Sequence, residues 1–126
     1  MRVLLDTVTF LWAVSSPEQL SKTALTALGG ESTVREISAV SLSEIAIKQT
    51  LGKLAFGKEA VAQGIADLRL RILPYTGKHA YVLFDLPLHH ADPCDRQIIA
   101  QALAEEIPVV TADRAFGLYK GLEVLW

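Results

Sequence analysis

Two short, mostly apolar segments of this chain, 2–5 and 107–110, each lead into an aspartate. Asp6 follows the first segment directly, and Asp113 follows the second after two intervening residues. Runs of this length and composition are typical of buried strands in a parallel sheet. Ligand chemistry in such sheets gathers at the carboxyl ends of the strands. The sequence therefore predicts that two carboxylates share one edge of a sheet.

Two more acidic residues stand at the starts of predicted helices. Ser41 and Glu44 form a capping box, which predicts a helix over 41–51 with the glutamate in its first turn. Asp92 precedes a proline, a strong helix-start signal, and Asp95 then lies in the first turn of that helix. With right-handed crossovers, the carboxyl ends of parallel strands and the amino ends of the following helices lie at one edge. All four acidic side chains are therefore expected to converge.

Converging carboxylates repel one another in a partly desolvated cleft, so they require protons or cations there. Hard oxygen ligands of this kind select Mg²⁺ or Mn²⁺ over zinc. A bound divalent ion lowers the pKa of a water and stabilises charge on a phosphate, which suits phosphodiester hydrolysis. The candidate catalytic and metal-binding residues are Asp6, Glu44, Asp95 and Asp113.

Each of these acidic residues also has a purely structural interpretation. Glu44 could serve only its capping box, and Asp95 could be an acid favoured by the helix dipole. Asp113 could cap a short helix that follows it, whereas Asp6 has no helix to cap unless one begins at Thr7. Chance is a poor explanation for all four together, so the metal-site hypothesis is preferred.

Hydroxyl and basic side chains accompany the acidic ones. Thr7 and Thr111 could support the site by hydrogen bonds to a carboxylate or a metal-bound water, although threonine is common at strand ends for other reasons. Each of three basic residues could contact a substrate phosphate or simply compensate a neighbouring negative charge. These residues are Lys48, Arg96 and Arg114.

Four further polar or reactive residues are assigned no chemistry. His89 and His90 lack a cysteine or glutamate at helical spacing and are interpreted as loop residues. Cys94 would lie in the first turn of a helix, but no base with triad logic accompanies it, so it is interpreted as a packing residue. Asp92 is interpreted mainly as a helix cap.

The elements that must position these residues alternate along the chain between strand and helix, which indicates an α/β sandwich with a parallel sheet. No repeat, linker or low-complexity tract divides residues 1–126, so a single domain is expected. Strands are predicted at 2–5, 34–40, 69–73, 107–110 and 123–126. Helices are predicted at 9–14, 22–28, 41–51, 58–68, 76–84, 93–105 and 114–119.

Composition limits the class of protein. Hydrophobic residues make up 51% of the chain, slightly above the usual range of about 45–50%, so some apolar surface is expected to remain for a partner. The formal net charge of −2 creates no general field for a polyanion, so local basic residues would have to bind nucleic acid. Cys94 is the only cysteine, which excludes an internal disulfide and fits a reducing cytoplasm. No apolar run reaches the roughly 18 residues of a membrane helix, so no membrane partner is expected.

Several separated motifs of the chain together resemble the PIN-domain ribonucleases of the VapC toxin type. The resemblance runs from end to end in the right order. The motifs are residues 4–7, 38–48, 51–54, 90–102 and 110–113, with a closing Leu-Trp at 125–126. The resemblance implies a three-layer α/β/α sandwich with a five-stranded parallel sheet and RNA cleavage that depends on Mg²⁺ or Mn²⁺. It also implies a homodimer and inhibition by a cognate antitoxin.

Carried over position by position, the resemblance assigns the acidic quartet to the same four residues. It also places Thr7 and Thr111 at hydroxyl positions that often accompany the quartet. Three positions depart from the family pattern: Val8 replaces a histidine or asparagine, Ser43 a tryptophan and Cys94 a phenylalanine. No carboxylate is lost, so these departures concern substrate preference and the shape of the groove.

The sequence thus predicts an endoribonuclease toxin, with Asp6, Asp95 and Asp113 as the more direct metal ligands and Glu44 as a ligand or as a residue that orients the attacking water. An alternative is an inactive PIN-like module that sequesters a partner through its apolar surface. Metal-dependent RNA cleavage would separate these two hypotheses. A phosphoryl-transfer enzyme of the receiver or haloacid-dehalogenase kind ranks last, because the second aspartate of the dehalogenase motif and the strand-end lysine of receivers are missing.

Overall fold

The computed structural model describes residues 1–126, and it contains one five-stranded sheet in which every strand pair is parallel. The strand order is β3-β2-β1-β4-β5, so the first strand lies at the centre. The strands are β1 (Arg2–Leu5), β2 (Val34–Ser38), β3 (Arg71–Leu73), β4 (Val109–Val110) and β5 (Val124–Leu125). The predicted five-stranded parallel sheet is confirmed.

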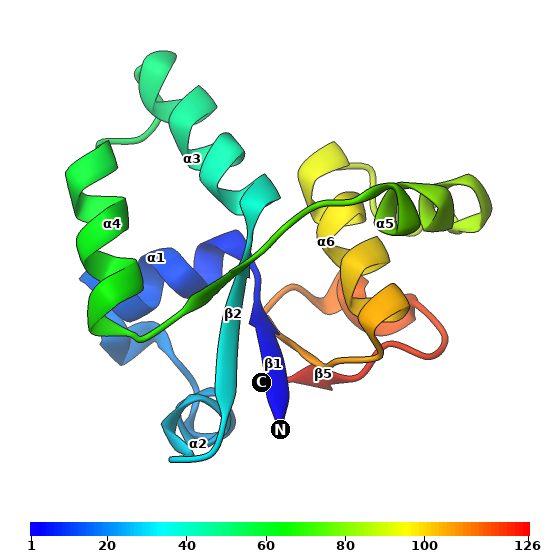
Figure 1. The fold of residues 1–126 in the computed structure, drawn as a ribbon, viewed down its shortest axis with the longest axis horizontal. Helices are drawn as coiled ribbons and strands as arrows, with labels where there is room; N and C mark the ends of the chain where they lie inside the picture. The colour runs from blue at the N-terminus through cyan, green and yellow to red at the C-terminus, as the bar shows by residue number, and fades with distance from the viewer.

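Helices cover both faces of this sheet, which gives the three predicted layers (Figure 1). One face carries α1 (Thr7–Ser15), α2 (Lys22–Gly29), α3 (Ala39–Thr50) and α4 (Lys58–Asp67), and the other carries α5 (Gly77–Val82) and α6 (Pro93–Glu105). Three short 3₁₀ helices join them: η1 (Pro17–Gln19), η2 (Leu83–Asp85) and η3 (Arg114–Leu118). None of the helices combines the length and the apolar character that crossing a membrane requires.

The core lies on both sides of β1. Leu4 packs with Ile99 of α6 on one face, and Leu5 packs with Phe10 and Ile37 on the other. All five side chains are at most 1% exposed. A central strand buried on both faces needs apolar residues at every position, and this explains the uninterrupted run that ends at Asp6.

The start of α3 differs from its prediction. The helix begins at Ala39, because the Ser38 side chain accepts a hydrogen bond from the Val40 N–H at 3.0 Å. The predicted capping box of Ser41 and Glu44 is therefore wrong, and β2 ends at 38 rather than 40. Glu44 lies in the second turn of the helix, where only 8% of the residue is exposed.

Some other element ends follow the sequence signals, while others differ from the prediction, including β3 and β4, which begin two residues later than predicted. Helix α6 begins at Pro93 with Asp92 as its cap, and Gly52 takes a left-handed φ of 71° just after α3. Helix α1 starts at Thr7, two residues earlier than predicted. The predicted helix over 76–84 divides into α5 and η2.

At the far end of the sheet from Asp6, a charged cluster joins β1, β2, α5 and α6. Arg2 Nε lies 2.6 Å from Glu36 Oε2, and Arg2 Nη1 lies 3.2 Å from Glu105 Oε1. The buried His79 and the exposed Lys78 contact Glu105 Oε2 at 2.9 and 3.2 Å. These hydrogen bonds, led by the one from His79, lower the pKa of Glu105 to about 2.

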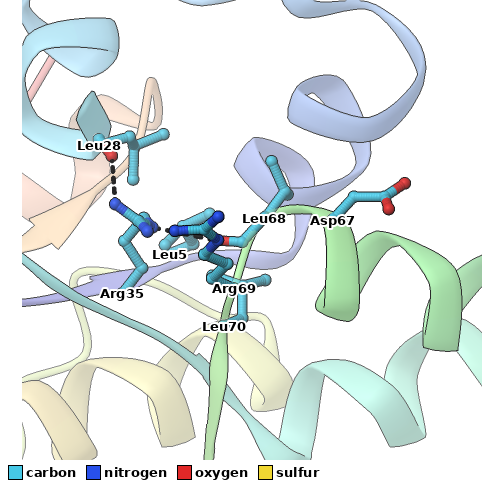
Figure 2. A pocket seen from close by; sticks show the side chains of 7 residues that line it. All are labelled: Leu5, Leu28, Arg35, Asp67, Leu68, Arg69 and Leu70. Atoms are coloured by element: carbon cyan, nitrogen blue, oxygen red, sulfur yellow. Dashed lines mark hydrogen bonds between the residues drawn. The ribbon is translucent and has the colours of Figure 1, made fainter. Parts of the chain in front are cut away.

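A second tie between elements lies beneath a small surface pocket at the ends of α2 and α4 (Figure 2). Arg35 of β2 donates from Nη1 to the Leu28 carbonyl oxygen at 2.8 Å and from Nε to the Leu68 carbonyl oxygen at 3.0 Å. Both oxygens belong to residues at or next to helix ends, which leave carbonyl groups without helical partners. The charge of Arg35 is thus committed to holding two helices against the sheet.

Candidate metal centre

The candidate site lies where the order of the strands reverses. From β1 the chain passes to β2 on one side, and it later returns to place β4 on the other side. The crevice outside the carboxyl ends of two such strands is the usual ligand site of open parallel sheets. Asp6 follows β1 and Asp113 follows β4, while α3 and α6, which carry Glu44 and Asp95, contact each other above this edge. Figure 1 shows α3 starting directly above the upper end of β2, with the start of α6 to its right.

Asp6 is held in a single orientation by two hydrogen bonds. Its Oδ1 accepts from the Thr9 N–H at 2.9 Å, so it does cap α1, and its Oδ2 accepts from the Thr111 hydroxyl at 2.6 Å. Only 4% of Asp6 is exposed, and this burial, with a smaller contribution from the charge of Asp113, raises the pKa of its carboxyl. A cationic partner would therefore favour the ionised form of Asp6.

Glu44 is also fixed through both of its oxygens. The Thr7 hydroxyl donates to Glu44 Oε1 at 2.6 Å, and the Ser41 hydroxyl lies 2.8 Å from the same threonine oxygen. Lys48 Nζ lies 2.9 Å from Glu44 Oε2, and this bond raises the pKa of the lysine. The expected ion pair at spacing i, i+4 is thus present, and the lysine neutralises one carboxylate of the cluster.

Asp95 and Asp113 meet at a histidine that the sequence interpretation left as a loop residue. His90 Nε2 lies 3.1 Å from Asp95 Oδ2 and 2.7 Å from Asp113 Oδ2. Asp113 Oδ1 accepts from the Ala115 N–H at 3.0 Å, so this aspartate also caps η3. His90 does lie in the loop before α6, as predicted, but its ring also joins two of the candidate ligands, a contact that the sequence analysis did not predict.

Asp92 brings a fifth carboxyl group to the cluster. Its Oδ1 accepts from the Asp95 N–H at 3.1 Å, which confirms the predicted cap. Burial, together with the charges of Asp92, Glu44 and Asp6, raises the pKa of Asp95 to about 7, although His90 opposes the shift. Asp95 therefore lies within electrostatic range of Glu44 and Asp6, and Asp6 lies within range of Asp113. Sequence reasoning could have included Asp92, because it stands three residues before Asp95 at the same helix start.

The two predicted arginine contacts differ from each other. Arg96 Nη1 and Nη2 donate to the carbonyl oxygens of Pro87 and Leu86 at 2.9 and 3.1 Å. The backbone of the 86–90 loop thus engages this guanidinium, so a phosphate contact by Arg96 would require it to exchange these bonds. Arg114 is exposed beside Asp113 and stays a candidate for that role.

The donor set fits a hard divalent ion. Ligand atoms of His90, Asp95 and Asp113 lie within 4.8 Å of one another, and so do those of Glu44, Asp92 and Cys94. Burial and the neighbouring acids raise the pKa of the Cys94 thiol, so it stays protonated at neutral pH and is a poor ligand for a soft metal. Carboxylate oxygens therefore dominate, as Mg²⁺ and Mn²⁺ require.

Solved structures share this architecture. VapBC2 from Rickettsia felis, bound to a DNA fragment from its promoter, matches with a TM-score of 0.75 and 20% identity over 98% of this chain and 97% of that one. DNA-bound VapBC from Salmonella typhimurium matches with a TM-score of 0.71 and 19% identity over 98% and 96%. A weaker likeness joins the chain to the PIN domain endonuclease Utp24, with a TM-score of 0.51 and 21% identity over 92% and 74%.

At identities near one fifth, these likenesses concern the fold. No curated protein matches the chain. The sequence itself, however, matches the PIN domain family over residues 3–122, which includes every acidic residue of the site. The chain therefore belongs to the PIN domain family.

Proposed function

We propose that this PIN domain is a divalent-metal-dependent endoribonuclease, the toxin of a toxin–antitoxin pair, which hydrolyses RNA phosphodiesters with Mg²⁺ or Mn²⁺. The supporting observation is the convergence of Asp6, Glu44, Asp95 and Asp113 at the strand-order reversal, with Lys48 as the only lysine or arginine in an ion pair with any of them. Because so little positive charge offsets the negative charge of these carboxylates, the cluster favours binding of a cation.

The roles of the side chains follow from how each is held. Asp6, Asp95 and Asp113 would hold the ion, and Glu44 would either bind it or orient the attacking water. When bound, the ion supplies a water of lowered pKa and stabilises charge on the phosphate and on the leaving oxygen. The bond from Thr111 fixes Asp6, while the contacts that Thr7 and Lys48 make fix Glu44. Fixed carboxylates need little reorganisation during the reaction.

Hydrolysis by this arrangement would place the attacking water in line with the scissile P–O bond. The new P–O bond would form on the phosphate, and the leaving oxygen would take a proton. The products would be a 5′-phosphate and a 3′-hydroxyl. Lys48 and Arg114 border the acidic cluster and would contact neighbouring phosphates of the strand.

Partners of two kinds are proposed from the apolar surface that the fold leaves open. An apolar groove between α3 and α4 is lined by Leu42, Ala46, Val61 and Ile65. On the other side of the molecule, Tyr81 and Phe84 are 74% and 84% exposed. We propose that a cognate antitoxin and a second copy of the chain cover such surfaces, in keeping with the VapBC complexes that share the fold. The lone cysteine suits action in the cytoplasm.

A cleavage assay with purified protein tests the activity. Single-stranded RNA should be cut with Mg²⁺ or Mn²⁺ and left intact with a chelator. Asp6→Asn should reduce the rate by at least about 100-fold, as expected for loss of a metal ligand. Asp67→Asn is the matched control, because Asp67 is exposed on α4 and its side chain accepts a hydrogen bond from Gln63 rather than from a residue of the site.

Cleavage by Asp6→Asn at a rate close to that of the unmodified protein would contradict the proposed site. A protein that binds RNA or a protein partner but never cuts would favour the inactive binding module instead. Mapping the 5′ ends of cellular RNA after brief induction, with the Asp6→Asn protein for comparison, would then identify the RNA that is cut.

A further inference from the structure

We propose that His90 is a positioning residue that holds Asp95 and Asp113 at the separation a shared cation needs. This inference rests on the proposed metal-dependent function. The two aspartates come from different elements, since Asp95 lies in α6 and Asp113 follows β4. One ring nitrogen of His90 lies 3.1 Å from the first and 2.7 Å from the second. His90 lies in the loop that leads into α6, whereas Asp113 follows β4. The His90 ring therefore links the α6 side of the site directly to the β4 side.

The hydrogen bonds of the ring establish its tautomer. The Asp92 backbone N–H can only donate, and it lies 3.2 Å from His90 Nδ1, so Nδ1 accepts. In a neutral imidazole the proton is then on Nε2, where it donates to Asp113 Oδ2, with Asp95 Oδ2 3.1 Å from the same nitrogen. A protonated Nε2 has no lone pair for a metal, so the geometry favours a hydrogen-bond donor to the ligands over a ligand.

Packing fixes the plane of the ring. The Phe116 ring meets His90 edge to face, with 5.7 Å between the ring centroids and an interplanar angle of 88°. Phe116 is fully buried, so it cannot move without disturbing the core of η3 and α6. His90 is thus restrained in rotation as well as in hydrogen bonding.

The backbone of His90 is held by a clamp made of Arg96 and Tyr119. The N–H groups of His89 and His90 donate to the Tyr119 hydroxyl oxygen at 3.1 and 2.9 Å. Arg96 Nη1 lies 3.4 Å from the same oxygen and 3.3 Å from the His90 carbonyl oxygen. Side chains from α6 and from the segment after η3 therefore set the position of the loop, and the loop sets the position of the ring.

A donor of this kind acts on the metal through its ligands. The N–H bonds to Asp113 Oδ2 and lies 3.1 Å from Asp95 Oδ2, so it reduces the mutual repulsion of the two carboxylates before an ion enters. Loss of such an outer partner in metal sites typically weakens binding by about 10- to 100-fold. The bonds that Asp6 and Glu44 receive from threonines would persist, so removal of His90 should weaken the site without abolishing it.

The test measures the dissociation constant of Mn²⁺ by titration calorimetry of the metal-free protein and its variants. His90→Ala should weaken Mn²⁺ binding by about tenfold or more. His90→Gln should retain affinity within about threefold, because its amide N–H₂ reaches nearly the same position as Nε2. His89→Ala is the control, since His89 is exposed and its ring contacts Tyr119 rather than a carboxylate.

Each outcome bears on the proposal. Equal Mn²⁺ affinity in His90→Ala and the unmodified protein would overturn it, and so would a His90→Gln variant as weak as His90→Ala, which would instead identify a metal ligand. A protein that binds no Mn²⁺ at all would overturn the proposed function itself. Nitrogen NMR of the metal-free protein gives a second readout, since a proton on Nδ1 rather than Nε2 of His90 would also overturn the positioning role.

Discussion

Replacing Asp95 by asparagine should stabilise the metal-free protein even though it removes a metal ligand. The pKa of Asp95 rises from its usual value near 3.8 to about 7 in the folded protein. The folded state therefore binds this proton more tightly than the unfolded chain does. Consequently the wild-type protein loses stability as the pH rises from about 4 to 7, and this loss persists at higher pH. Asparagine keeps an oxygen that can accept from His90 but carries no charge, so the loss disappears.

The size of this effect follows from the pKa shift. A shift of roughly three units corresponds to about 4 kcal/mol at about 1.4 kcal/mol per unit. The Asp95 side chain is 21% exposed, so solvent screening reduces the expected gain to about 2–3 kcal/mol at pH 8. For a domain of this size, each kcal/mol changes the Tm by about 3–5 °C. The Asp95→Asn variant should thus melt about 6–15 °C above the unmodified protein.

Thermal unfolding of both proteins in a chelator at pH 4 and pH 8 measures the effect. The two should melt at similar temperatures at pH 4, and their Tm values should diverge as the pH rises from about 4 to 7 and stay apart at pH 8. Added Mn²⁺ should then raise the Tm of the unmodified protein more than that of the variant. An Asp95→Asn protein that melts at or below the unmodified Tm at pH 8 would refute the electrostatic account of the cluster.

Three other predictions concern packing, a distant charge cluster and a supporting hydroxyl. A Cβ at Gly64 would lie 2.7 Å from Val14 Cγ2, so Gly64→Ala should lose about 1–3 kcal/mol in urea unfolding despite its better helix propensity. Gly29→Ala, with nothing within 4 Å of the new Cβ, should instead be neutral or gain up to about 1 kcal/mol. The lowered pKa of Glu105 gives stability above pH 4.5 that is lost as the pH falls toward 2. Glu105→Gln should therefore cost about 1–2 kcal/mol at pH 7, after allowance for screening, and much less at pH 2, where the carboxyl is half protonated. Thr111→Val should weaken Mn²⁺ binding by about tenfold in calorimetry, and unchanged affinity would contradict a supporting role.

Much of the fold could be predicted from local signals. The apolar runs before Asp6 and Asp113 have few interpretations other than strands buried on both faces, and parallel strands place their carboxyl ends together. The start of α3 could not be predicted in the same way, because Ser38, Ser41 and Ser43 are all possible caps. The structure uses Ser38, while Ser41 is fully buried against Thr7. Burial of a serine by a distant residue is invisible to a local motif.

The residues that local reasoning missed have partners far along the chain. His90 contacts Asp113, which is 23 residues away. A search for zinc-type spacing around the two histidines cannot detect that contact. Arg96 was predicted to contact a phosphate or to compensate a neighbouring charge because it follows Asp95. Its guanidinium instead bonds to the loop that precedes α6. Side-chain direction on a helix depends on what packs above the preceding turn, and only the fold determines that.

Three carboxylates of the site are at the same time helix caps, which explains why the fold creates the cluster. Asp6 caps α1, Asp92 caps α6 and Asp113 caps η3. An N-cap carboxylate bonds to a backbone N–H and lies at the positive end of its helix, so local structure stabilises its negative charge. The Asp95 carboxylate accepts no hydrogen bond from a backbone N–H. Its contact with His90 Nε2 is shared with Asp113 and stabilises its charge less than such a bond would. Burial and the charges of Asp92, Glu44 and Asp6 raise the pKa of Asp95, and unlike Glu44, which pairs with Lys48, it has no lysine or arginine partner. A cation at this edge would then stabilise the negative charge of Asp95, as backbone N–H groups already stabilise the charges of the three caps.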